Sequence, residues 1–94
     1  MKFEEFQKSL TDQGPSGNLS EYLQSLWYDA QGNWNKAHEI IQDLEDKNAA
    51  WIHAYLHRKE GDVGNADYWY RRADKKRPNI TLQEEWEAIA KALL

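Results

Sequence analysis

The sequence predicts an all-α protein of about six short antiparallel helices, with two helical hairpins between an N-terminal helix and a C-terminal capping helix. Three observations lead to this prediction. Apolar residues recur at spacings of three and four between glycine and proline breaks, and no stretch alternates as a strand would. Residues suited to helix capping precede several of these segments. A shift of 29 residues aligns one hairpin-sized segment with the next, which indicates an internal repeat.

The elements follow one another with short connections, which favours antiparallel neighbours. We expect hairpin units at about 19–46 and 48–77 and a capping helix at about 82–94. The predicted apolar faces are, in order, Phe3, Phe6 and Leu10; Leu19, Leu23, Leu26 and Ala30; Trp34, Ala37, Ile40, Ile41 and Leu44; Trp51, Ile52, Tyr55 and Leu56; Ala66, Trp69, Tyr70 and Ala73; Leu82, Trp86, Ile89 and Leu93. The predicted caps and breaks are Gly32, Asn33, Asn48, Gly61, Asp62, Pro78 and Thr81, the last in a capping box with Glu84.

Length and composition indicate one domain, residues 1–94, with an aromatic core. The chain has 94 residues, with five Trp, five Tyr and two Phe, and we expect Trp27, Trp69 and Trp86 to lie in the core. There is no Cys, so disulfides, thiolate metal sites and cysteine catalysis are excluded. No apolar run approaches the roughly 18 residues of a membrane span, and the N-terminus is too polar for a signal peptide. We therefore expect a cytoplasmic protein with no membrane partner.

The net charge of −4 is unevenly distributed along the chain. Residues 1–47 hold four Lys and nine acids, a net of −5, whereas residues 48–94 hold eight Lys or Arg and seven acids, a net of +1. An acidic protein lacks the basic footprint of nucleic-acid binding, so we expect no nucleic-acid partner. The basic cluster at 71–77 fits the end of a helix, where the macrodipole favours cations.

The second hairpin unit carries a recognisable spacing. Gly61, Ala66, Tyr70, Ala73 and Pro78 stand at the intervals found in tetratricopeptide repeats, and this unit resembles that family. Residues 66–73 also resemble the second helix of SEL-like repeats, and the whole chain looks like small uncharacterised bacterial proteins of this type. The resemblance implies a stack of helical hairpins whose terminal helix covers the exposed stacking face.

The resemblance also implies a binding surface. In that family the first helices of successive hairpins line a concave groove that holds extended peptides, and Trp, Tyr and Arg are frequent interface anchors. The implied function is a non-catalytic module that binds a protein or peptide segment. The alternative is that these rings simply pack in the interior. The matching positions are Tyr22, Leu26, Asp29, Trp51, Tyr55 and Arg58.

Histidines suggest a different function. His53 and His57 are four residues apart and share one helix face, a spacing that suits two metal ligands. A third ligand would have to come from His38 or from a carboxylate on the neighbouring helix. Three interpretations remain open: a hydrogen-bonded structural pair, a pocket for a small ligand, and a metal site that could be enzymatic.

Catalytic motifs are otherwise missing from the sequence, so we expect no enzyme activity and no cofactor. The segment between His53 and His57 lacks the glutamate of the H-E-x-x-H signature. Adjacent acids such as Glu84 and Glu85 are expected to be solvated. Apolar surface left over on a two-unit stack could pair two copies of the chain, which makes a homodimer a further expectation.

Overall fold

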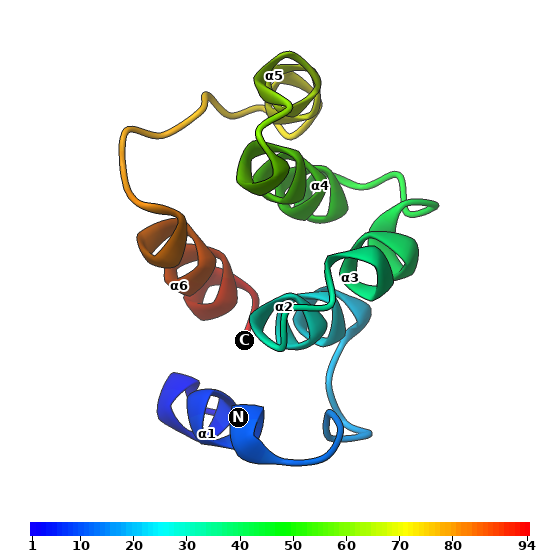
Figure 1. Cartoon of the computed structure of the whole chain (residues 1–94), viewed down its shortest axis with the longest axis vertical. Helices are drawn as coiled ribbons and strands as arrows, with labels where there is room; N and C mark the ends of the chain where they lie inside the picture. Colours follow the sequence, from blue (N-terminus) through cyan, green and yellow to red (C-terminus); the bar gives the residue numbers. More distant parts are fainter.

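The computed structural model describes residues 1–94 and confirms an all-α fold of six helices with no strands. The helices run in chain order with loops of three to nine residues between most of them (Figure 1). None of them combines the length and apolar character that crossing a bilayer requires. Their bounds are α1 Phe3–Lys8, extended by a 3-10 turn at Ser9–Thr11, α2 Glu21–Ala30, α3 Trp34–Ile41, α4 Lys47–Glu60, α5 Val63–Arg72 and α6 Leu82–Leu93.

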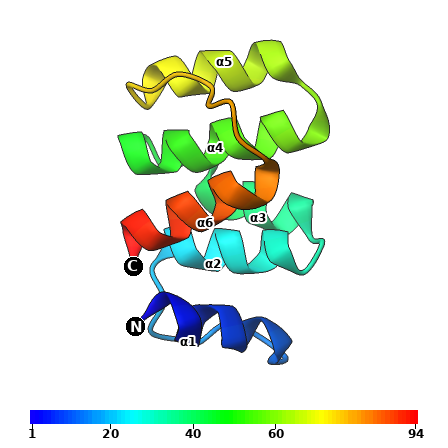
Figure 2. The same ribbon diagram turned by 90° about the vertical axis from the view of Figure 1, so that its left-hand side faces the viewer.

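Two helical hairpins, α2–α3 and α4–α5, form the body of the molecule. Figure 1 shows α2, α3, α4 and α5 following one another along its long axis, with α1 beyond α2 at the far end. Helix α6 lies beside α2 and α4, as Figure 2 shows from the side, and it packs against both. The contact between the two hairpins is made by α3 with α4 and by α2 with α4.

The two hairpin turns are built alike, as the 29-residue repeat predicts. Gly32 and Gly61 adopt φ values of 82° and 90°, a left-handed conformation that glycine accommodates without strain. The predicted caps are confirmed, because the side chains of Asn33 and Asp62 accept backbone N–H groups of α3 and α5. The matched turn hydrogen bonds run from Gly32 N to Asp29 O and Gly61 N to Arg58 O, and from Asn33 N to Tyr28 O and Asp62 N to His57 O.

Two details between the hairpins differ from the prediction. Asn48 does not cap α4, which begins at Lys47, because the first helical hydrogen bond already runs from Ala50 N to Asp46 O. Leu44 lies outside α3, which ends at Ile41. A tight turn follows, in which Leu44 N donates to Ile41 O, and this turn reverses the chain toward α4.

The C-terminal helix lies elsewhere than the resemblance implies. Its capping box at Thr81 and Glu84 is confirmed. Its apolar face, however, covers the first helices of both hairpins and leaves α5, at the end of the stack, uncovered by it. Trp86 explains this position, because its ring stacks on Phe6 with centroids 5.7 Å apart and its Nε1 donates to the carbonyl of Leu26. The first helices and α1 therefore share one core with α6.

Candidate metal centre

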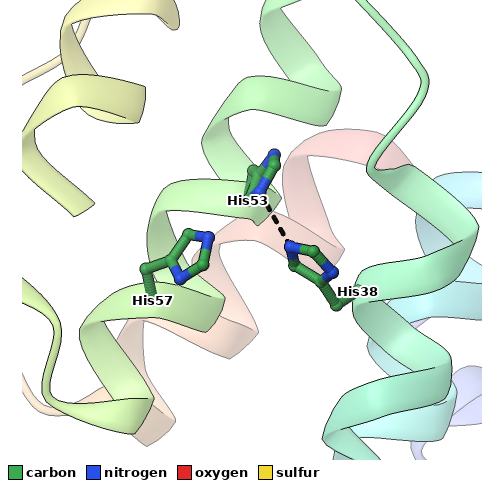
Figure 3. Close-up of side chains that lie close together, drawn as sticks. All are labelled: His38, His53 and His57. Carbon is green, nitrogen blue, oxygen red and sulfur yellow. Dashed lines mark hydrogen bonds between the residues drawn. The ribbon is translucent and has the colours of Figure 1, made fainter. Parts of the chain in front are cut away.

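Three histidines from two helices converge at the junction between the hairpins. His38 comes from α3, whereas His53 and His57 lie one turn apart on α4. Figure 3 shows the three rings pointing toward one another. One potential ligand atom from each residue lies within 4.8 Å of the others, and Nε2 of His38 is 2.9 Å from Nε2 of His53. All the histidines of the chain thus occupy one cluster, which we call the three-histidine centre.

Two tryptophans hold the three-histidine centre in place. Trp34, one turn before His38 on α3, stacks on the His38 ring with centroids 4.9 Å apart, and its Nε1 donates to the Leu56 carbonyl of α4. Trp69 of α5 stacks on the His53 ring at 3.8 Å. These stacked pairs exclude water from one side of each ring and limit its rotation. Three helices therefore contribute to the centre: α3 and α4 provide the histidines, and α3 and α5 provide the tryptophans that stack on them.

Glu60 orients the third imidazole. Its Oε1 lies 2.6 Å from Nδ1 of His57, so Nδ1 donates to the carboxylate, and in the neutral imidazole the lone pair is then on Nε2. A carboxylate behind a histidine is the usual partner of a metal-bound imidazole, because it fixes the tautomer and increases the basicity of the ligand nitrogen. One turn after the predicted pair of His53 and His57, α4 thus provides a carboxylate that contacts His57.

Burial keeps His38 and His53 neutral. The His53 side chain is 6% exposed, and this burial, with the charges that His38, His57 and Arg72 would present, lowers its pKa to about 3. Burial likewise lowers the pKa of His38. Only a neutral imidazole offers the lone pair that a metal needs. At neutral pH both rings are therefore uncharged, and a metal ion would replace the one proton that lies between their Nε2 atoms.

This burial predicts a loss of stability in acid. The folded-state pKa of His53, about 3, lies below its ordinary value of 6.5, so between these pH values only the unfolded chain binds the proton. Acidification below pH 6.5 should therefore lower the free energy of unfolding, with a slope approaching about 1.4 kcal/mol per pH unit from His53 alone. Urea unfolding of metal-free protein between about pH 5 and 6.5, where most carboxylates stay ionised, measures the slope. His53→Gln should flatten it, and an equal slope in both proteins would contradict the assignment.

The distances in the three-histidine centre suit a tetrahedral metal. Zinc binds imidazole nitrogens at about 2.0–2.1 Å, which places neighbouring ligand atoms about 3.3 Å apart. The ligand atoms here lie between the 2.9 Å of the His38–His53 pair and the 4.8 Å limit of the whole set. Small rotations of the rings would close the set around one ion. Three protein ligands also leave a fourth position for water or another small ligand.

A second set of potential ligands overlaps with the first. His57, Glu60 and Asp62 also bring three ligand atoms within 4.8 Å of one another. Asp62, however, already caps α5 by accepting the backbone N–H of Asn65, and Glu60 holds His57 Nδ1. These bonds assign Asp62 to the hairpin turn and Glu60 to the orientation of His57.

The six positions expected to line a groove gather on one side of the first helices, but α6 lies over that side. Leu26, Asp29 and Tyr55 are at most 2% exposed. Trp51 and Arg58 are half-buried and donate to Glu85 of α6. Tyr22, also half-buried, hydrogen-bonds with Asp46, which raises the pKa of its hydroxyl. Binding of a peptide at these residues remains a prediction, and most of their surface is already in contact with the chain itself.

Two functional details escaped the sequence analysis. Glu60 stands three residues after His57, a spacing that places it on the same helix face and could have identified it. The expectation that Glu85 is solvated is wrong, because this carboxylate is 1% exposed and bonds side chains of α4 and α5.

No family model, curated protein or solved structure matches the chain, so its function has to be inferred from the geometry of these residues.

Proposed function

We propose that this protein binds one divalent transition-metal ion through the imidazole nitrogens of His38, His53 and His57. The observation that supports the proposal is the convergence of all three histidines, from two helices, within 4.8 Å. Two neighbouring features add to it: the carboxylate of Glu60 behind His57 and the aromatic wall of Trp34 and Trp69. A structural histidine pair would require neither a third imidazole nor a carboxylate behind it.

The donor set selects a class of metal. Three imidazoles without thiolates or several carboxylates suit zinc, copper or nickel, whereas Mg²⁺ and Ca²⁺ prefer oxygen ligands. The proposal is for binding rather than catalysis. A substrate would need space beside the metal, and the cavities of the structure are lined by other residues.

Bound metal would link the two hairpins. His38 belongs to the first hairpin and the other two ligands to the second, so one ion would tie α3 to α4. A ligand that binds only the folded state stabilises it, by about 2.7 kcal/mol at a free concentration of 100 times Kd. The role that we propose is therefore a metal-responsive helical protein whose hairpin junction stiffens when the ion binds.

Calorimetric titration of tag-free protein with ZnCl₂ tests the proposal. We expect binding of one equivalent, loss of binding in His38→Ala, and binding weakened about 10- to 100-fold in Glu60→Gln, because the carboxylate that accepts from His57 Nδ1 is lost. Cu²⁺ should also quench tryptophan fluorescence, since Trp34 and Trp69 contact two of the ligands.

The matched control is Glu39→Gln, which alters an exposed acid next to His38 outside the cluster and should bind as the wild type does. No heat at micromolar zinc would contradict the proposal. So would undiminished binding by His38→Ala, because the second set of ligands would then hold the ion without the three-histidine centre.

A further inference from the structure

Helix α6 fills the groove between the first helices incompletely. At the C-terminal ends of α2 and α4 a cavity of about 320 Å³ remains. Side chains from α1, α2, α4 and α6 line it, among them Gln7, Asp29, Lys59, Gln83 and Trp86. This volume lies at the lower end of the range of small-molecule sites, which are concave and mix an apolar wall with a few polar groups.

A charge pair between the buried Asp29 and the exposed Lys59 contributes polar groups to this cavity. Asp29 is 2% exposed, and its two carboxylate oxygens accept hydrogen bonds from the Tyr55 hydroxyl at 2.8 Å and from Lys59 Nζ at 2.9 Å. Removing a carboxylate from water is costly unless it is paired in this way. The pair fixes the ammonium group of Lys59 at the mouth of the cavity.

The cavity has more free donors than free acceptors. An ammonium group carries three N–H donors, and the only bond of Lys59 goes to Asp29, so two donors are left for another group. The side-chain amides of Gln7 and Gln83 make no hydrogen bond within the protein. The charge of Asp29 is already engaged by its two partners. A ligand that enters here therefore meets the two free N–H donors of the Lys59 ammonium, which is paired with Asp29, and two free amide groups.

Another part of the lining is apolar. Leu10 and Trp86 line it together with the ring of Tyr55. Flat rings and short apolar groups pack well against such a surface. The cavity thus combines the free N–H donors of Lys59 with an apolar surface, which is the arrangement that a small organic acid requires.

We propose that this cavity is a binding site for a small monocarboxylate with an aromatic or apolar body. The carboxylate bonds Lys59 and the amides of Gln7 and Gln83, and the body packs on Leu10 and Trp86. The cavity shares no residue with the three-histidine centre, so this site is independent of metal binding.

Phenylacetate, phenylacetamide and benzylamine probe the site, because they share an aromatic ring and differ in charge. Each is titrated into ¹⁵N-labelled full-length protein with EDTA present, so that no metal contributes. We expect saturable shifts of amides at the ends of α2 and α4 with phenylacetate, and binding about tenfold or more weaker with the other two, because neither carries the negative charge that pairs with the Lys59 ammonium.

Lys59→Met should abolish binding of phenylacetate, whereas Lys36→Met, which changes a lysine beside Tyr28 outside the cavity, should leave it unchanged. If Lys59→Met does not fold, the double variant Gln7→Ala, Gln83→Ala serves in its place, with binding weakened about tenfold. Absence of saturable shifts, equal or tighter binding of benzylamine, or unchanged binding by the cavity variants would overturn the proposal.

Discussion

Replacement of Glu85 by alanine is expected to lower the free energy of unfolding by about 3–5 kcal/mol, because it breaks a buried charge network from one side. The Tyr70 hydroxyl lies 2.8 and 2.7 Å from the two oxygens of Glu85, which share its single proton, and Arg58 Nη1 lies 2.8 Å from one of them. Trp51 Nε1 adds a longer bond of 3.3 Å. Alanine would leave the Tyr70 hydroxyl without a partner and would take from Arg58 its carboxylate, so that only the Ile80 carbonyl still accepts from the guanidinium.

The decrease in the free energy of unfolding should lie toward the lower end of the range of about 3–5 kcal/mol. The Arg58 side chain is 18% exposed, so water can solvate its guanidinium in the variant. Urea denaturation at pH 7 measures this decrease. Glu87→Ala is the matched control, because Glu87 lies on the same helix without a side-chain hydrogen bond and should change stability by no more than about 0.5 kcal/mol. Glu85→Gln, which keeps the bond from Tyr70, should fall between them. Equal stability of Glu85→Ala and Glu87→Ala would show that the network contributes nothing.

Glu85 also shows which parts of the fold could be predicted from sequence. Helix periodicity, the glycine turns and the capping box are local signals, and the structure has them at Gly32, Gly61 and Thr81. The burial of a single glutamate depends on which helices meet around it. Glu84 and Glu85 are neighbours with the same chemistry, yet one caps α6 at the surface and the other lies in the interior. Only the packing of α6 against α4, which also brings Tyr70 of α5 to Glu85, distinguishes them.

The three-histidine centre likewise combines a local feature, which sequence predicts, with a tertiary one, which it does not. The i, i+4 spacing of His53 and His57 places them on one face of a helix, and this much is local. Whether His38 lies close to the other two histidines depends on the angle at which α3 crosses α4 after the turn at 42–46. The six groove positions lie on one side of the first helices, and α6, which packs against α2 and α4, covers most of that side. Sequence therefore identified the faces, and tertiary packing determined what each face meets.

Trp86→Ala should be at least as destabilising as the loss of Glu85, by about 3–5 kcal/mol, because it empties a large volume at the centre of the core. Trp86 is 3% exposed, stacks on Phe6 and meets Phe3 edge-on at 6.2 Å. Its indole N–H also satisfies the Leu26 carbonyl. A domain of 94 residues has a stability of about 5–14 kcal/mol, so this substitution alone removes a large part of it.

The position of the cavity left by this substitution predicts where the structure should loosen. Helix α1 is only six residues long, and both its aromatic residues, Phe3 and Phe6, rest on Trp86. Amide exchange in α1 should therefore accelerate more than in α4 or α5, which pack on each other. Tyr68→Ala removes an aromatic ring that is 45% exposed and is the matched control, with a small change in stability and no change in α1. If α1 keeps its protection in Trp86→Ala, contacts other than the stacked rings hold it to the hairpins, and the shared core that joins α1, α2 and α6 does not depend on this tryptophan.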